Sequence, residues 1–239
     1  MRFSKICLCV FMLLFACTAI QAKDFWELKP YNEWTDKECE KMLQNSPWAR
    51  EINLQGISYG GGGAAATDSQ APYVKYTVQL QTAPPIRQAI VRLQNIQANY
   101  DALSMEEQQR LNEESLDYLT SDSEFVVVQV SFAANNRDTI QNLLKHWQTQ
   151  TVDMLKNSVY LRGSKGSKVA IVRYVPVSGA AQVFKFVFPR QVNGKDILQP
   201  GDKGLQLEFE YPVVGGIGDG RGFLEFKTDK MKFNNEIVY

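Results

Sequence analysis

The chain has 239 residues with 26 basic and 26 acidic side chains, so its formal net charge is zero. Nucleic acid is excluded as an expected partner, because phosphate backbones are bound through clustered lysine and arginine and this chain has no basic tail or cluster. The apolar content of 44% indicates a folded globular protein, and no motif has catalytic or metal-ligand spacing. We therefore expect no metal and no cofactor.

The N-terminus, residues 1–22, has the pattern of a signal peptide. Two basic residues stand at its start, an apolar run extends over Ile6–Phe15, and small residues precede a processing site after Ala22. The run is too short to span a bilayer. Cleavage after Ala19 is the alternative, and either cut would release a soluble protein. We expect export to the periplasm or the extracellular space.

The leader also allows a lipid anchor. Leu14-Phe15-Ala16-Cys17 resembles a lipobox, in which Cys17 becomes the lipidated first residue and ties the protein to a bacterial membrane. A retained signal anchor is a further alternative, and we expect contact with a membrane only through such an anchor. The leader holds two basic residues and three of the four cysteines, which leaves 24 basic against 26 acidic residues and Cys39 alone.

Residues 23–50 form a tryptophan-rich segment with a clear helix signal. Thr35-Asp36-Lys37-Glu38 has the pattern of a capping box, which predicts a helix from Asp36, and Pro47 prevents its continuation. Cys39 falls on the apolar face of this helix and is expected to be a small buried residue. A free reactive thiol or a disulfide with a partner is the alternative.

The tryptophans of this segment are the first candidate binding residues. Trp26, Trp34 and Trp48 lie within 23 residues of one another. We expect their rings to clamp the helix to the main domain, because burying an indole is worth a few kcal/mol. The alternative is that the three indoles form a stacking platform for a sugar or a peptide.

The region 51–158 mixes strands and helices. Apolar and polar residues alternate over Tyr73–Leu80, as in a half-buried strand, whereas the apolar run within Phe125–Phe132 indicates a central strand covered on both faces. The predicted elements are a strand over Ile52–Tyr59, a strand over Tyr73–Leu80, a helix from Pro84, a helix from a second capping box at Ser104 to about Leu119, a strand over Phe125–Phe132 and a helix from Asn136 to about Lys156.

Several residues of this region bear on function. Arg87, near a helix start, is a candidate anion contact. His146, the single histidine, is expected to be a surface or structural group, because one histidine cannot build a multi-histidine metal site. The glycine-rich run Gly60–Ala66 is expected to be a loop. The second helix carries acidic residues that we expect to form a solvated face rather than a catalytic carboxylate pair: Glu106, Glu107, Glu113, Glu114 and Asp117.

From residue 159 the pattern changes to strands and turns, which predicts a β-rich region over 159–239. Leu205–Tyr211 alternates as a strand with one buried face. The glycines of Gly215–Gly222 do not form a dinucleotide fingerprint, because the strand pattern Phe223–Lys227 follows where a helix would be needed. We expect hairpins here, with Met231–Tyr239 closing the sheet.

Several short segments together resemble a family of exported acidobacterial proteins. These segments are Asp24-Phe25-Trp26, Trp34-Thr35-Asp36-Lys37-Glu38, Ser46-Pro47-Trp48-Ala49, Pro85-Ile86-Arg87-Gln88-Ala89, Phe188-Pro189-Arg190 and the stretch Phe223–Tyr239. The resemblance covers most of the chain after the leader and implies a bacterial envelope or extracellular setting, but no reaction. Val74-Lys75-Tyr76 departs from the family, whose members tend to have an arginine-tryptophan pair there.

The sequence thus predicts an α+β fold with an N-terminal helical clamp, a mixed central part and a mainly antiparallel C-terminal half. The leading functional hypothesis is an exported, non-enzymatic protein that binds a macromolecule or a small ligand of the envelope. Its candidate contacts are Trp26, Trp34, Trp48 and Arg87. The alternatives are a secreted hydrolase without a recognisable motif, and an assembly factor that exposes a long edge strand.

Overall fold

The computed structural model describes residues 24–56, 71–121 and 123–239. The predicted leader, including Cys17, and the glycine-rich run Gly60–Ala66 lie outside the described residues. The described part is an α+β fold, as predicted, and all of its strand pairings are antiparallel. None of its helices has the length and apolar character needed to cross a membrane.

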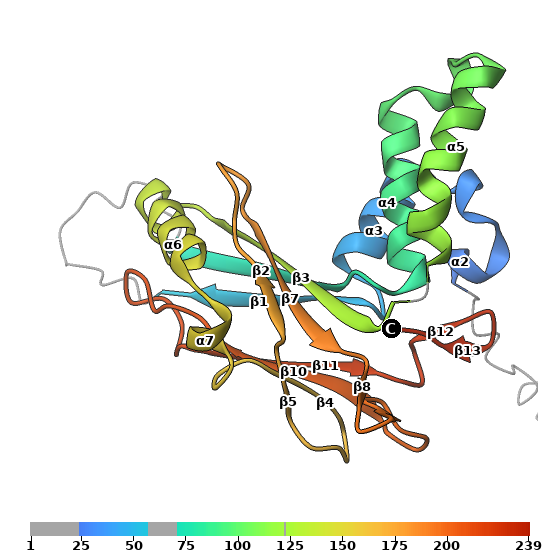
Figure 1. Ribbon diagram of the computed structural model, residues 1–239. Helices are drawn as coiled ribbons and strands as arrows, with labels where there is room; N and C mark the ends of the chain where they lie inside the picture. The colour runs from blue at the N-terminus through green and yellow to red at the C-terminus, as the bar shows by residue number, and fades with distance from the viewer. Residues whose placement is uncertain (1–23, 57–70, 122) are drawn as a thin grey trace, which may run out of the picture.

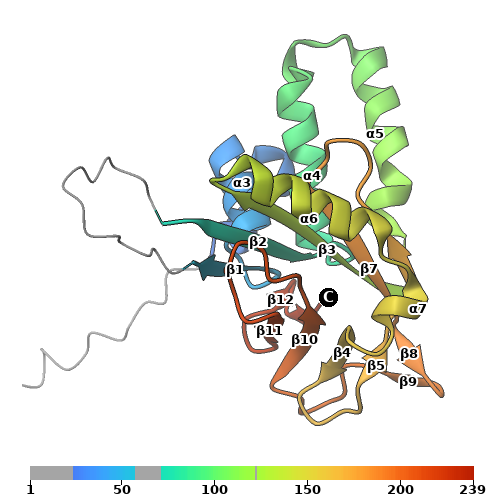
Figure 2. The ribbon, with the colours of Figure 1, turned by 90° about the vertical axis from the view of Figure 1, so that its left-hand side faces the viewer.

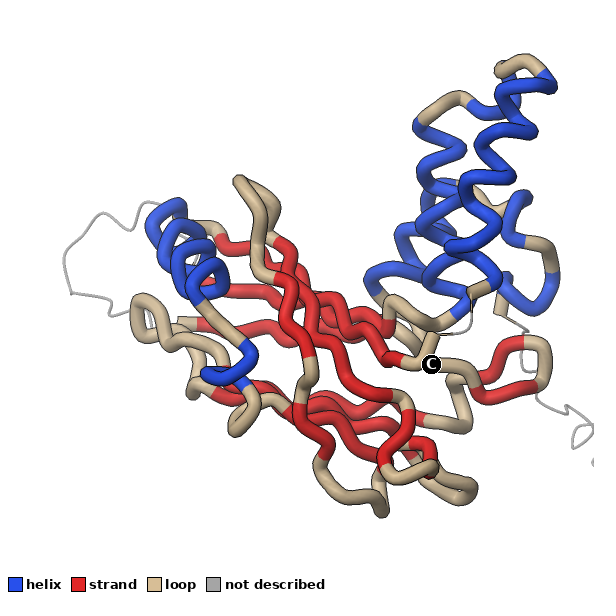
Figure 3. The backbone as a smooth tube through the Cα atoms, viewed as in Figure 1, coloured by secondary structure: helices blue, strands red, loops and turns tan. Residues whose placement is uncertain are grey.

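Two sheets form the body of the molecule (Figures 1 and 3). The first sheet has the strand order β1 (Ala49–Gln55), β2 (Tyr73–Leu80), β3 (Phe125–Ala134), β7 (Val183–Pro189), β6 (Arg173–Val175). The second has the order β11 (Arg221–Lys227), β10 (Gly204–Glu210), β4 (Tyr160–Gly163), β5 (Val169–Ala170). Two short ribbons complete the strands: β8 (Gln191–Val192) with β9 (Lys195–Asp196), and β12 (Lys232–Phe233) with β13 (Glu236–Ile237).

The core lies between the two sheets, where aromatic residues from both meet. Tyr76 of β2 and Phe186 of β7 both contact Phe209 of β10, with ring centroids 6.0 Å and 5.8 Å apart. Apolar residues alternate along these strands, so one face of each strand points inward. The two sheets and the N-terminal segment share one continuous core.

Helices cover the two ends of the sandwich (Figure 2). At one end, α6 (Arg137–Thr149) and α7 (Val152–Leu155) lead into β4. At the other end stand α2 (Phe25–Leu28), a 3-10 turn over Tyr31–Glu33, α3 (Asp36–Gln44), α4 (Pro84–Gln97), a 3-10 turn over Tyr100–Ala102 and α5 (Met105–Thr120). Helices α4 and α5 form a hairpin that projects away from the sheets (Figure 1).

Local sequence signals located most of these elements correctly. Both capping boxes are formed, with Thr35 and Ser104 accepting the N–H groups of Glu38 and Glu107, so α3 and α5 begin where predicted. The strand Tyr73–Leu80 has the predicted bounds.

Other predicted elements need correction. The first strand, β1, begins at Ala49, three residues before the predicted Ile52, and the end of the predicted strand, residues 57–59, lies outside the described residues. The predicted helix from Asn136 to Lys156 is divided, because the Thr151 side chain caps a new short helix by accepting the N–H of Met154. β3 is central, but its residues alternate between buried and half-buried, so it is not covered on both faces.

The change of pattern at residue 159 does not separate two sheets. β7 and β6, from the C-terminal half, pair beside β3 in the first sheet. The segment Met231–Tyr239 forms its own two-stranded ribbon and does not close either sheet. These pairings join distant segments, which the local pattern does not reveal.

Candidate functional site

Among the α-helices of the described residues, α5 is the one without a fully buried residue. α5 is a 16-residue helix without a single buried residue. α4 buries Pro85, Ile86, Ala89 and Val91. α4 is therefore the helix of the pair that packs into the core. α5 is held mainly by contacts at its C-terminal end and along the side that faces α4.

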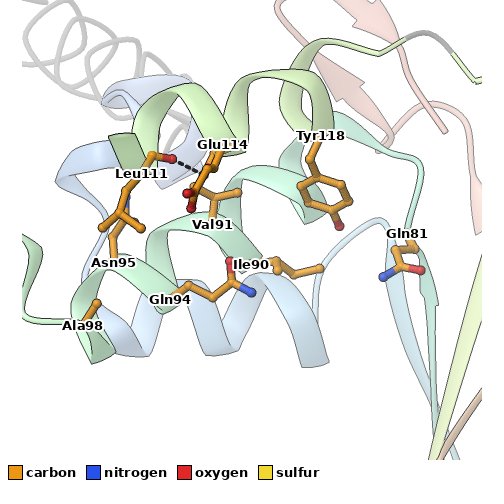
Figure 4. A pocket seen from close by; sticks show the side chains of 10 residues that line it. Gln81, Ile90, Val91, Gln94, Asn95, Ala98, Leu111, Glu114 and Tyr118 are labelled. Atoms are coloured by element: carbon orange, nitrogen blue, oxygen red, sulfur yellow. Dashed lines mark hydrogen bonds between the residues drawn. The ribbon is translucent and has the colours of Figure 1, made fainter. Parts of the chain in front are cut away.

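A groove of about 540 Å³ lies between the two helices (Figure 4). In this view Leu111 and Tyr118 extend from α5 towards α4, and Ile90 lies opposite them on α4. The lining residues recur at helical spacing on each helix, so each helix presents one face to the groove. They are Gln81, Ile90, Val91, Gln94, Asn95, Ala98, Leu111, Glu114, Ser115 and Tyr118.

The groove combines aliphatic walls with amide groups. Gln81, Gln94 and Asn95 each carry a primary amide, which can both donate and accept hydrogen bonds. Glu114 is the single carboxylate among the lining residues, and its Oε1 lies 2.5 Å from Nη1 of Arg110. The groove therefore suits binding through hydrogen bonds and apolar contact, within the size range of ligand pockets.

Tyr118 places a buried hydroxyl at the wider end of this groove. Its oxygen is buried and forms no hydrogen bond of standard geometry with the described residues. Burial raises the pKa of Tyr118, an effect that Arg87 and the Gln81 side chain partly offset. The hydroxyl thus stays protonated at neutral pH.

Arg87 fixes the base of the hairpin. Its Nη1 donates to the carbonyl oxygens of Tyr118 and Ser121, at 2.9 Å and 2.8 Å, at the C-terminal end of α5. Last-turn carbonyls have no partner within a helix, so this arginine from the first turn of α4 caps α5. The contact of Arg87 with an external anion stays a prediction.

A second arginine lies beside the same base. Arg190 donates from Nε to Ser123 O at 2.9 Å and from Nη2 to Tyr239 O at 2.7 Å, and its guanidinium lies 4.4 Å from the centre of the Tyr239 ring. Arg87 and Arg190 both line a hollow of about 260 Å³. Both side chains tie chain segments together there.

The three tryptophans do not form a stacking platform. The exposed fractions of Trp26, Trp34 and Trp48 are 7%, 1% and 0%. Trp26 packs edge-to-face on Trp48, at a centroid distance of 5.8 Å, and Phe25 packs in the same way on Trp34. Because neighbouring aromatic side chains of the same protein cover the three indoles, the platform hypothesis is wrong, and the tryptophans belong to the core.

The remaining titratable candidates are also buried or structural. Cys39 is fully buried, and burial raises the pKa of its thiol to about 11, so it is protonated and shielded. His146 packs edge-to-face on Trp147 at 4.8 Å, and burial lowers its pKa. In the described ranges, no three residues among His, Cys, Asp and Glu are grouped as a metal site would require.

Comparison with models of known protein families, with curated proteins and with solved structures gave no significant match. The groove residues were not among the predicted contacts, because amides and aliphatic residues carry no motif. The available signal was their helical spacing, Ile90, Gln94 and Ala98 on one helix and Leu111, Ser115 and Tyr118 on the next.

Proposed function

We propose that this is an exported, non-enzymatic binding protein of the bacterial envelope or the extracellular space, and that the α4–α5 hairpin is its binding element. The single observation that carries the proposal is α5, a 16-residue helix with no buried residue that stands over a groove of about 540 Å³. A helix in a globular protein gains most of its stability from burying one face, so α5, whose face towards α4 is only half-buried, gains less of that stability.

The chemistry of the groove favours binding over catalysis. Three primary amides, the Ser115 and Tyr118 hydroxyls and an aliphatic wall provide hydrogen bonds and apolar contact. A carboxylate pair for acid and base catalysis would need a second acid beside Glu114. The lining residues include no such acid and neither histidine nor cysteine, so no observation favours the hydrolase alternative.

The leader and the resemblance to exported acidobacterial proteins support export. We propose the periplasm or the cell exterior as the location, with Cys17 as the possible lipid attachment point. Intact mass measurement of the protein from membrane and soluble fractions of its native host tests this. A diacyl or triacyl adduct on Cys17, or an unmodified chain beginning at Lys23 or Ile20, supports export. A cytoplasmic chain that keeps residues 1–22 contradicts it.

Site-specific photocrosslinking in the native host tests the hairpin. A benzoylphenylalanine at Gln94, in the groove, should give a discrete crosslinked product on illumination. The matched control carries the same group at Val192 on β8, which is 41% exposed and lies outside the hairpin. A product at both positions, or at neither, would contradict the assignment of the hairpin as the binding element.

A further inference from the structure

α5 presents a second surface that the groove does not use. With 3.6 residues per turn, the side chains of Gln108, Leu111, Ser115 and Tyr118 share the half-buried face towards α4. Met105, Gln109, Asn112 and Leu116 recur at i, i+4, i+7 and i+11 on another face, and all four are exposed. We call these four residues the outer stripe. Its two apolar members are 87% exposed at Met105 and 55% exposed at Leu116.

A row of carboxylates runs beside the outer stripe. The residues one position after the outer stripe are Glu106, Arg110, Glu113 and Asp117, so a parallel row of three carboxylates and one arginine runs along the helix. In the described part of the chain none of the three acids forms an ion pair. The one basic residue of α5, Arg110, is paired with Glu114. The row therefore presents three exposed carboxylates that have no ion-pair partner among the described residues.

The spacing of the outer stripe is that of a coiled-coil seam. Positions 105, 109, 112 and 116 correspond to successive d and a positions of a heptad, and Glu106 and Glu113 then occupy e positions. In two-helix contacts the e and g positions select the partner by charge. A helix beside α5 would bury Met105 and Leu116 and would meet acidic flanks.

We propose that the outer stripe of α5 docks a cationic amphipathic helix of a partner protein. The inference rests on the proposed function, because it names the partner class of the same hairpin. Charge complementarity identifies the occupant: lysine or arginine on the partner's flanks would pair with Glu106, Glu113 and Asp117. The partner segment spans about two heptads, since α5 is roughly 24 Å long at 1.5 Å per residue.

The carboxylates beside the outer stripe disfavour two other binding partners, a second copy of α5 and an anionic membrane. A second copy of α5 placed on the outer stripe would bring two carboxylate rows together, and like charges at helix flanks are destabilising. An anionic bilayer surface attracts basic segments, whereas this face is acidic. The polar residues Gln109 and Asn112 within the stripe fit an exchangeable contact rather than a permanent one, because polar residues in a seam lower its stability and set its register.

A designed peptide provides the test. The probe is a peptide of about two heptads with leucine at a and d and lysine elsewhere, and its partner probe has glutamate in place of lysine. Calorimetric titration of the protein with the lysine peptide should give one-to-one binding that weakens as salt is raised, and the glutamate peptide should not bind.

Matched variants separate docking from general attraction between opposite charges. The triple variant E106Q, E113Q, D117N removes the carboxylate row and should weaken binding of the lysine peptide at least tenfold. The control variant E33Q, E236Q, D229N removes the same charge from exposed acids outside α5 and should leave binding unchanged. A third variant, Leu116→Gln, should weaken binding without a change in net charge. All substituted positions are exposed, so folding is retained and is checked by circular dichroism.

The outcomes are distinct. Failure of the lysine peptide to bind, equal weakening by both triple variants, or a dimer through α5 in sedimentation overturns the inference. In each of these cases a crosslink at Gln94 would still support the hairpin as the binding element. Loss of the crosslink at Gln94 together with one-to-one peptide binding would instead count against the groove while supporting the outer stripe.

Discussion

Helices α5 and α6 have similar lengths, 16 and 13 residues, but opposite relations to the core. α6 buries Thr139, Leu143 and Trp147, whereas α5 has one half-buried face and no fully buried residue. The Trp147 ring stacks on Phe184 at 4.0 Å, and the Tyr174 hydroxyl donates to the Trp147 carbonyl oxygen at 2.5 Å. α6 thus packs into the core, whereas α5 lies on the surface of the molecule.

The difference distinguishes the helices that stabilise the fold from the hairpin that we propose for binding. α5 depends on its capping box, on intrahelical pairs such as Arg110 with Glu114, and on Arg87 at its base. The capping box and the ion pair each contribute about 0.2–2 kcal/mol and a hydrogen bond of the Arg87 guanidinium about 1.5–3 kcal/mol, whereas Trp→Ala or Phe→Ala in a core costs about 3–5 kcal/mol. We therefore expect α5 to open locally without unfolding the sheets.

The largest effect should come from Trp147. Trp147→Ala removes a ring that contacts both sheets and should lower the free energy of unfolding by about 3–5 kcal/mol. Leu116→Ala on α5 is the matched control and should change it by less than about 0.5 kcal/mol. Urea denaturation measures both. Similar losses for the two variants would mean that α5 is as integral to the fold as α6.

The second largest effect should be a loss of stability of the two packed sheets at alkaline pH. Burial raises the pKa values of Tyr76 and Tyr174, and burial together with the Asp219 carboxylate raises that of Tyr211 to about 12. A folded pKa above the unfolded value of about 10 gives stability that is fully present below that pH and is lost as pH rises through the folded pKa. The urea midpoint should therefore hold to about pH 9 and then fall. A urea midpoint that stays constant through about pH 12 would contradict the contribution of these buried hydroxyls.

Arg87 should have an intermediate effect, confined to the hairpin. Arg87→Met keeps the apolar stem but removes the donors to Tyr118 O and Ser121 O, and hydrogen bonds of charged groups contribute about 1.5–3 kcal/mol. Amide exchange should accelerate along α5 and stay unchanged along α6. Arg110→Met, which breaks an exposed pair with Glu114, should cost less than about 0.5 kcal/mol and serves as the control.

The smallest and sharpest contrast is between the two capping boxes. Thr35→Ala and Ser104→Ala remove the same interaction, worth about 1 kcal/mol, from α3 and α5. Because α3 buries Cys39 and Met42, its variant should lower global stability by that amount. The α5 variant should only increase fraying of the helix start in amide exchange. A global loss in both would contradict the independence of α5.

The sequence predicted correctly those elements whose interacting residues are close together along the chain. Thr35 and Glu38 are three residues apart, and alternation within Tyr73–Leu80 marks one strand, so these elements were predicted. Trp48 donates from Nε1 to Val238 O across 190 residues, and such a contact leaves no local signature. The same reason explains why the tryptophans were open to a stacking interpretation until their neighbours were known.

The candidate site was less accessible to prediction than the fold. Arg87 was identified as a charged residue near a helix start, but its capping of a second helix depends on how α4 and α5 pack. The groove likewise exists only between two helices. The acidic face of α5 was predicted as solvated, and the structure shows these residues exposed.

The strand order of the first sheet determines when its strands can pair during synthesis of the chain. β3 lies between β2 and β7, yet β7 begins at Val183, about fifty residues after β3 ends. During synthesis from the N-terminus, one edge of β3 has no strand to pair with until β7 has been made. The hydrogen bond from Trp48 Nε1 to Val238 O can form only when the last residues have been added. During that interval the nascent chain is extended and vulnerable to pairing with other chains.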